Sequence, residues 1–284
     1  MTTQETRRFV KLILGLTAAA LTICTVCRTL RHAEASYTQE LANLRQNRCE
    51  GTQRFHRCDK KGLIAHGGGL GEFLYTNSTE AIADSLYRNF RFIEIDFQET
   101  PDHHLIGAHD WQHFHSITGH AGERTPLTLA KAEERKIYQK FHPATARDLR
   151  EFMRSHKDFI LVTDKINNYE LLMREIPYPE QMIVEVFSPQ DYLRALKVGI
   201  PFAAFNVPNK AALKLAQQHL FPIITISADL FLNNAETMQR MHRMGICIMV
   251  YGTEGIDLQA FVNKHLGNTA SMIYTSEISP ASQH

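Results

Sequence analysis

The sequence has almost no excess of charge. Its 284 residues include 31 Lys and Arg against 30 Asp and Glu, which gives a formal net charge of +1. General nucleic-acid binders usually present a basic face that neutralises phosphates, so this balance argues against nucleic acid as a partner. A disordered chain is excluded as well, because 44% of the residues are hydrophobic and 16 are Phe. The length allows one large domain or two small ones.

Cysteines are few, and their spacing is not that of a metal site. No second CxxC pair accompanies Cys24-x-x-Cys27, which argues against structural zinc. Cys24 and Cys27 lie in an apolar run, the wrong context for a redox motif. Cys49 and Cys58 are close enough in sequence to form a disulfide in an oxidising compartment. Cys247 lies in an apolar run and is expected to be a small buried hydrophobic residue.

An uncharged segment stands near the N-terminus. Residues 12–27 would form a helix of roughly 24 Å, slightly short of the ~30 Å hydrocarbon core of a bilayer. Such a segment is an uncleaved signal anchor, a secretory signal peptide or a buried helix of a soluble protein, and its N-terminal position and basic flank weigh against the last. We expect a signal anchor or signal peptide at residues 1–33, a stalk or linker at 34–60 and the globular domain at 61–284. That domain would be membrane-anchored or exported, on the non-cytoplasmic side.

From residue 62 onward, short apolar runs alternate with helical patterns. The expected strands are residues 63–65, 92–97, 159–162, 182–187, 202–205, 223–226, 246–251 and 272–274. The expected helices are residues 77–89, 146–156, 189–198, 209–219, 234–244 and 254–265. Eight strands that alternate with helices fit a (β/α)8 TIM barrel better than an open sheet. No GxGxxG motif follows the first strand, which weighs against a dinucleotide-binding fold.

One stretch, residues 110–145, interrupts this alternation. It follows a hairpin-like run at residues 105–108, and its residues 128–138 have the pattern of a charged helix. Insertions at the carboxyl ends of barrel strands usually shape the mouth of the substrate site. Trp111, at the start of this stretch, is therefore either a wall of the mouth or a packed core residue.

Two carboxylates lie close together in the run 92–97. In a single strand Glu94 and Asp96 would share one face, because residues two apart point to the same side. Carboxylates inside a barrel repel each other and lose hydration, and a hard divalent cation compensates both effects. The alternative is an edge strand with a solvated acidic face.

Histidines are numerous, at 15. His66 ends the first expected strand, where barrel enzymes carry catalytic groups. Gly67 and Gly68 follow it and could offer backbone amides to an anion. His109 follows the 105–108 run, where a lone histidine is more often structural. Five more histidines are expected to be loop residues and not ligands: His103, His104, His113, His115 and His120.

Taken together, these residues resemble the signature of the glycerophosphodiester phosphodiesterase family, within the phosphatidylinositol phospholipase C-like phosphodiesterase superfamily. The matching positions are His66-Gly, Asn77, Glu94-x-Asp96, Thr100-x-Asp102 and His109-Asp110. They cover about residues 64–111, roughly a sixth of the chain. Residues 162–165 resemble the family's third metal-ligand strand.

The resemblance implies a role for each matching residue. His66 and His109 would form an acid–base pair, one taking the proton of the attacking hydroxyl and the other protonating the leaving alkoxide. Glu94, Asp96 and Asp164 would hold one divalent cation, Mg²⁺ or Ca²⁺. The attacking group in such families is often the substrate's own neighbouring hydroxyl, which forms a cyclic phosphate that water then opens.

The sequence departs from the family at two places. Gly67 stands where the family has Arg, so a bidentate phosphate contact is missing. Asp164 replaces the usual Glu, as in related phospholipase D-type toxins, and the lysine is adjacent instead of two residues on. The candidates for substrate contact are Gly67, Gly68, Lys165, Glu185 and Trp111. Glu185 lies between two valines and needs Lys165, the cation or solvent as a partner.

These observations predict a metal-dependent phosphodiester hydrolase acting on glycerophosphodiesters or related lipid-headgroup or envelope phosphodiesters. A phospholipase D-like or phosphoinositide-type lyase that releases a cyclic phosphate is one alternative. A second is a catalytically inactive, membrane-bound barrel that serves as a binding module, which the missing Arg would favour. The expected partners are a small phosphodiester or lipid headgroup and, through the N-terminal segment, a membrane.

Overall fold

The computed structural model describes residues 39, 62–69 and 75–280. The chain divides into two units, Met1–Phe55 and His56–His284, and every strand described here belongs to the second. The predicted N-terminal segments and the Cys49–Cys58 disulfide lie outside the described residues. Within the described part of the chain, no helix is long and apolar enough to cross a membrane.

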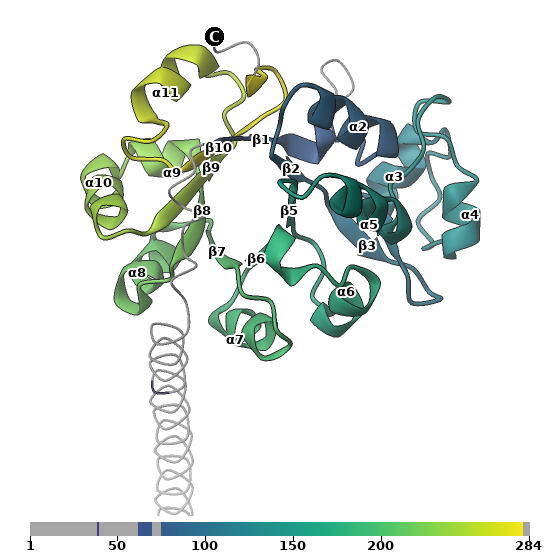
Figure 1. Cartoon of the computed structure of the whole chain (residues 1–284), viewed down its shortest axis with the longest axis horizontal. Coiled ribbons are helices and arrows are strands. Elements are labelled where there is room, and N and C mark those ends of the chain that lie inside the picture. The colour runs from purple at the N-terminus through teal and green to yellow at the C-terminus, as the bar shows by residue number, and fades with distance from the viewer. Residues whose placement is uncertain (1–38, 40–61, 70–74, 281–284) are drawn as a thin grey trace, which may run out of the picture. The chain divides into compact units, whose positions relative to one another are not determined.

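Eight parallel strands close into a barrel in the order β1-β10-β9-β8-β7-β6-β5-β2 (Figure 1). Their bounds are β1 Gly62–Ala65, β2 Phe92–Glu94, β5 Ile160–Thr163, β6 Met182–Val186, β7 Ala203–Val207, β8 Ile223–Ser227, β9 Cys247–Tyr251 and β10 Met272–Thr275. The first strand closes the barrel, because Ile64 pairs with both Tyr274 and Phe92. The predicted TIM barrel is confirmed.

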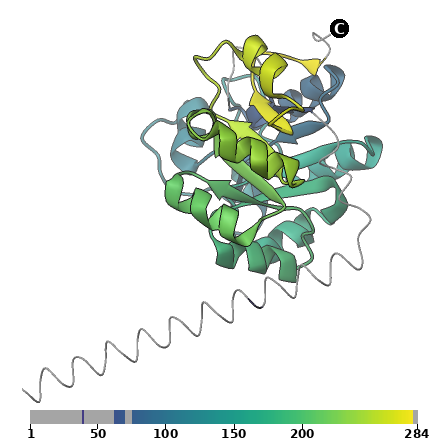
Figure 2. The ribbon, with the colours of Figure 1, turned by 90° about the vertical axis from the view of Figure 1, so that its left-hand side faces the viewer.

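Helices cover the outside of the strands, as the green and yellow segments in Figure 2 show. They are α2 Thr79–Tyr87, α5 Ala146–Ser155, α6 Tyr169–Glu175, α7 Pro189–Lys197, α8 Lys210–His219, α9 Ala228–Leu232, α10 Ala235–Arg243 and α11 Leu258–His265, with short 3-10 turns η1 His66–Gly68 and η2 Pro179–Gln181. Thr145 and Asp148 form a capping box at the start of α5. The prediction for the last helix began too early, because Asp257 caps α11 and residue 254 lies in the preceding loop.

The barrel interior is apolar at its centre. Side chains from all eight strands form one buried cluster that includes Ile64, Phe92, Val162 and Met249. Cys247 belongs to this cluster and is fully buried, as predicted. Polar side chains are buried nearer the carboxyl ends of the strands, and this is where the pocket opens.

The run 92–97 is not one strand, which corrects the prediction. β2 ends at Glu94, and Phe97 begins β3 (Phe97–Glu99), which pairs antiparallel with β4 (Leu105–Gly107) as the predicted hairpin. Asp96 therefore lies in the short connection where the chain leaves the barrel. Because that connection starts at the carboxyl end of β2, both acidic residues still reach the pocket.

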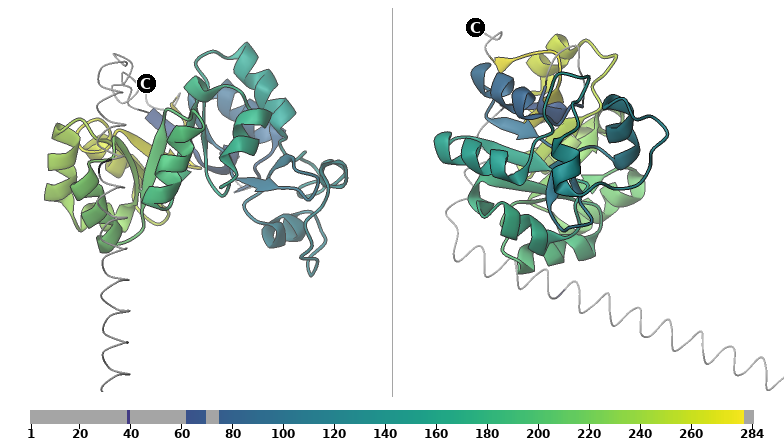
Figure 3. Two further views of the ribbon diagram at one scale, coloured as in Figure 1. Left: turned by 90° about the horizontal axis from the view of Figure 1, so that it is seen from below. Right: turned by 90° about the vertical axis from the view of Figure 1, so that its right-hand side faces the viewer.

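The insertion after the hairpin packs on a small core of its own. It contains α3 Trp111–Ile117 and α4 Leu129–Glu133, so the helix expected at residues 128–138 is much shorter than predicted. Ile106, Ala108, Phe114 and Ala132 form its buried cluster, with Trp111, Leu127 and Leu129 packed against it. Figure 3 shows this segment to one side of the barrel.

Candidate active site

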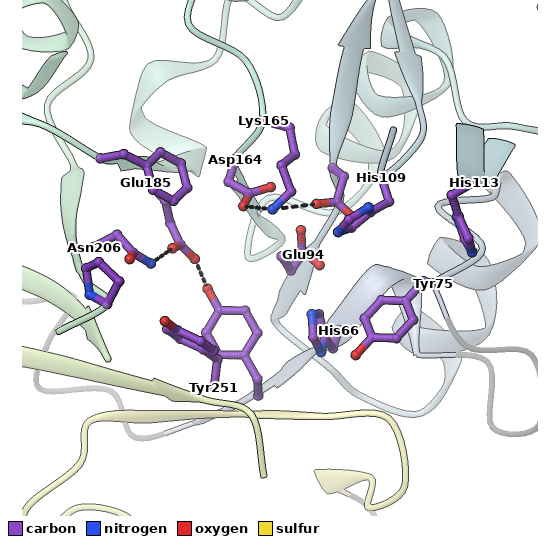
Figure 4. Close-up of a pocket in the computed structure, with 14 residues that line it drawn as sticks. His66, Tyr75, Glu94, His109, His113, Asp164, Lys165, Glu185, Asn206 and Tyr251 are labelled. Atoms are coloured by element: carbon purple, nitrogen blue, oxygen red, sulfur yellow. Dashed lines mark hydrogen bonds and ion pairs between the residues drawn. The ribbon is translucent and has the colours of Figure 1, made fainter. Parts of the chain in front are cut away.

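A pocket of about 540 Å³ lies at the carboxyl ends of the barrel strands (Figure 4). Strands on both sides of the barrel contribute to its lining. The lining residues are His66, Tyr75, Glu94, Asp96, His109, His113, Asp164, Lys165, Glu185, Phe187, Asn206, Pro208, Tyr251 and Tyr274. The two predicted catalytic histidines and the three predicted metal ligands therefore share one cavity.

Three carboxylates form a compact cluster in this pocket. Oxygen atoms of Glu94, Asp96 and Asp164 all lie within 4.8 Å of one another. Burial, and then the charges of its two neighbours, hold the pKa of Glu94 well above its ordinary value. Burial, followed by Asp96, raises the pKa of Asp164 to about 7.

The cluster fits a hard divalent cation. One oxygen of Asp164, Oδ1, is buried and has no hydrogen-bond partner among the described residues. Unpaired buried oxygens are costly, and Mg²⁺ and Ca²⁺ are bound by carboxylate oxygens. The donors present therefore match the cation that the sequence pattern implies.

Asn77 and Gly67, both outside the strands, orient the acidic side chains. Asn77 donates from Nδ2 to Asp96 Oδ2 at 3.0 Å, and its Oδ1 accepts from the Asp96 amide at 2.9 Å. Asn77 has a φ of +47°, a left-handed conformation that Asn tolerates better than most residues. The Gly67 amide donates to Glu94 Oε2 at 2.8 Å. These bonds set the positions of two ligands before any ion binds.

The glycines after His66 have contacts within the protein. The amide of Gly67 points at Glu94, and the carbonyl of Gly68 accepts a hydrogen bond from Ser85. A Cβ on Gly68 would lie 2.5 Å from that of Ala81, and φ is +87° at this residue. Close packing against α2 therefore accounts for glycine at position 68, and contact of Gly67 or Gly68 with phosphate stays a prediction.

The two histidines lie beside the carboxylate cluster in different surroundings (Figure 4). The His66 side chain is 21% exposed, and its ring packs edge-on against Tyr75 at 4.7 Å and Tyr274 at 5.4 Å between centroids. Burial is the main reason that the pKa of His66 is lowered. His109 is 44% exposed, and its Nδ1 lies 2.8 Å from Asp110 Oδ2.

Lys165 joins the cluster because of its backbone. Neighbouring residues of a strand point to opposite sides, but β5 ends at Thr163 and Lys165 has a φ of +60°. Its Nζ lies 2.9 Å from Asp164 Oδ2 and 4.0 Å from Asp96 Oδ1. Burial lowers the pKa of Lys165, but the attractions to Asp164, Asp96 and Glu94 together outweigh it, and the pKa is raised overall.

Glu185 is buried and held by neutral donors. Thr225 Oγ1 donates to its Oε2 at 2.8 Å, Asn206 Nδ2 donates to the same oxygen at 3.3 Å, and Tyr274 donates to Oε1. The sequence analysis expected Lys165, a cation or solvent as the partner, and the structure corrects this. Burial raises the pKa of Glu185 to about 7.

Several predicted positions lie elsewhere. Trp111 is not among the pocket-lining residues and packs on Phe114 in the insertion core, which settles its two predicted alternatives in favour of packing. His113 and His115 are on α3, so their prediction as loop residues was wrong. His113 lines the pocket, whereas His115 is buried beside the Thr125 carbonyl.

Sequence reasoning missed the roles of Asn206, Tyr251 and Tyr274. The signal was available for Asn206, a polar residue inside the apolar run of β7. The two tyrosines gave no comparable signal, because aromatic residues are common in strands. Only the pairing of β10 with β1 places Tyr274 next to His66.

Comparison with solved structures identifies the fold. The chain has a TM-score of 0.60 to a glycerophosphoryl diester phosphodiesterase from Parabacteroides distasonis, at 16% identity over 77% of this chain and 84% of that one. A glycerophosphodiester phosphodiesterase from Thermotoga maritima gives 0.59 at 13% identity, over 76% and 93%. An Oleispira antarctica phosphodiesterase, solved with the product sn-glycerol-3-phosphate, gives 0.61 at 11% identity, over 78% and 94%.

Neither a protein-family model nor a curated protein matches the sequence. The resemblance that the motif pattern indicates is therefore confirmed at the level of the fold, which is that of glycerophosphodiester phosphodiesterases.

Proposed function

We propose that this protein is a metal-dependent phosphodiester hydrolase. The observation that carries the proposal is the convergence of three carboxylates and two histidines in one pocket of a barrel with this fold. Glu94, Asp96 and Asp164 are the proposed ligands. A bound Mg²⁺ or Ca²⁺ would supply positive charge that polarises the phosphate and offsets the charge developing in the transition state.

The histidines divide the proton transfers between them. His66 is the more buried and has a lowered pKa, so it is largely neutral at pH 7 and can take the proton of the attacking hydroxyl. Asp110 lies against His109 Nδ1 and orients its ring, and His109 is the proposed donor of a proton to the leaving alkoxide. A new P–O bond to the substrate's neighbouring hydroxyl forms as the bond to the leaving group breaks, and water then opens the cyclic phosphate with the roles reversed.

Lys165 is the proposed phosphate contact. Among the described residues that line the pocket, it is the only lysine or arginine. It lies against Asp164 and Asp96, so its ammonium group is next to the place where a phosphate oxygen would meet the ion. It therefore supplies positive charge to the pocket of a chain whose Gly67 stands where the family signature has Arg.

The proposed substrates are glycerophosphodiesters or related lipid-headgroup phosphodiesters. The Oleispira antarctica phosphodiesterase was solved with the product sn-glycerol-3-phosphate, which supports a small phosphodiester as the substrate. An anchored or exported location, with the barrel on the non-cytoplasmic side, is supported by the uncharged N-terminal run at residues 12–27.

The test is hydrolysis of a panel of glycerophosphodiesters by the full-length protein with Mg²⁺, Ca²⁺ or EDTA. His66→Ala and His109→Ala should each lower turnover by about 10² to 10⁴-fold, the usual contribution of general acid–base catalysis. His156→Ala is the matched control, because His156 is exposed at the end of α5. Retained turnover in both active-site variants, or activity unaffected by EDTA, would contradict the proposal.

A lyase is the second candidate, because Asp164 is the third acidic ligand and position 67 lacks the family Arg. Phosphorus NMR of the products separates the two reactions. A cyclic phosphate that persists at the end of the reaction favours the lyase, whereas an open monoester favours the hydrolase. An inactive binding module would bind the phosphodiester without converting it.

A further inference from the structure

The loop between β9 and α11 brings a carboxylate to His66. Glu254 Oε1 lies 4.0 Å from His66 Nδ1 and accepts a hydrogen bond of 3.1 Å from the Tyr75 hydroxyl. We propose that Glu254 is a positioning residue for His66 and that Tyr75 holds it in place. The inference rests on the proposed function, in which His66 is the proton acceptor.

The geometry leaves one ring nitrogen for chemistry. Nδ1 faces Glu254, so Nε2 is the nitrogen that can meet substrate. Tyr75 and Tyr274 both pack edge-on against the imidazole, and the same Tyr75 carries the hydroxyl that binds Glu254. One aromatic side chain thus restrains both the ring and the carboxylate.

The need for a distant carboxylate follows from the local sequence. His109 has its acidic partner in the next residue, Asp110, whereas Ala65 and Gly67 flank His66 and carry no charge. Imidazole that accepts a proton becomes a cation, and a nearby carboxylate stabilises it. The fold supplies that carboxylate from the C-terminal half of the barrel.

Among the charged groups that face His66, Glu254 has the largest effect on its pKa. Burial is the largest influence and lowers the pKa of His66; Glu254 and then Asp164 raise it, and Lys165 and His109 lower it. Asp164 is a proposed metal ligand, so its charge would be offset in the loaded site. Glu254 is then the carboxylate left to stabilise protonated His66. Its side chain is 57% exposed, so solvent weakens the interaction and a modest effect is expected.

The experiment compares Glu254→Gln, Glu254→Asp and Tyr75→Phe in the full-length protein, with Glu236→Gln on the exposed face of α10 as the control. The pKa of His66 is followed by NMR of the ring, and kcat and KM are measured from pH 5 to 9 on a glycerophosphodiester that the panel shows to be hydrolysed. The NMR titration needs no turnover, so it tests the contact even if the proposed activity fails.

We expect Glu254→Gln to lower the pKa of His66 and to reduce kcat by about 3- to 10-fold with KM nearly unchanged. Glu254→Asp should recover part of the loss, and Tyr75→Phe should fall between Glu254→Gln and wild type. The proposal is overturned if the pKa of His66 in Glu254→Gln matches that in Glu236→Gln. It is equally overturned if the substitution raises KM and leaves kcat alone, because that would make Glu254 a substrate contact.

Discussion

At the residue scale, the site concentrates acidic groups that are unfavourable without compensation. Glu94, Asp96 and Glu185 are buried, and Asp164 is nearly so. Glu185 is compensated by three neutral donors, whereas the other three have Lys165 as their nearby cation. The cluster is therefore arranged for an additional positive charge, and the groups that orient it matter as much as the ligands themselves.

Asn77 is the residue that tests this view. Replacement by Gly removes both hydrogen bonds to Asp96 and suits the φ of +47° better than Ala would. We expect metal affinity to fall by about 10- to 100-fold, as is usual when a group that orients a ligand is lost. Isothermal titration with Mg²⁺ and Ca²⁺ measures it. Asn89→Gly is the matched control, since Asn89 also has a positive φ but is exposed at the end of α2; equal losses in both variants would refute the role of Asn77.

At the element scale, helix starts are determined by side-chain caps. Ser78, Thr145, Ser188 and Asn209 each accept a backbone N–H of the helix that follows, which satisfies a donor that has no partner within the helix. Asn77, which precedes Ser78 by one position, belongs to the site through its hydrogen bonds to Asp96. The cap of α2 thus helps to determine where Asn77 lies.

Two threonines that precede helices differ in whether the side chain bonds to the helix, so their contributions to stability can be compared. Thr145 accepts the amide of Asp148 and begins α5, whereas Thr128 precedes α4 without a side-chain bond to the helix. Thr145→Ala should lower the free energy of unfolding by about 1 kcal/mol, and Thr128→Ala by a few tenths or less. Urea denaturation of both variants measures the difference. Similar losses would mean that the capping box contributes little to the stability of the fold.

At the scale of the whole molecule, the site couples stability to pH. Burial raises the pKa of Asp164 from its ordinary 3.8 to about 7, and that of Glu185 from 4.5 to about 7. The folded state then binds protons more tightly than the unfolded chain does. The stability that these two groups contribute is present below their ordinary pKa values. It is lost as the pH rises from those values to the folded-state pKa of about 7.

A cation should reverse that loss. We expect the Tm of the metal-free protein to fall between pH 5 and pH 7.5, and Mg²⁺ or Ca²⁺ to raise Tm more at pH 7.5, where protons compete less for the carboxylates. Differential scanning calorimetry measures both effects. Asp164→Asn should reduce the pH dependence and the response to metal together. An equal response to metal at both pH values would contradict the coupling.

Much of the fold could be predicted from local patterns. Apolar runs of strand length that alternate with capped helical segments mark the barrel, because each local element must bury one face. Short elements escaped this reasoning: α3, α6 and α9 are too brief to show a clear helical period. The end of β2 before Asp96 could not be predicted either, because the chain leaves the sheet there and Asp96 bonds to the distant Asn77.

The sequence by itself determined the alternation of strands and helices and the spacing of Glu94, Asp96 and His109, since these are properties of neighbouring residues. Only the tertiary structure decided that the Lys165 side chain lies against Asp164 and that the Gly67 amide donates to Glu94. The contact between Glu254 and His66 was decided in the same way. The physical reason is closure of the barrel: it brings together the carboxyl ends of strands that are far apart in the chain, and no local pattern records which side chains meet there.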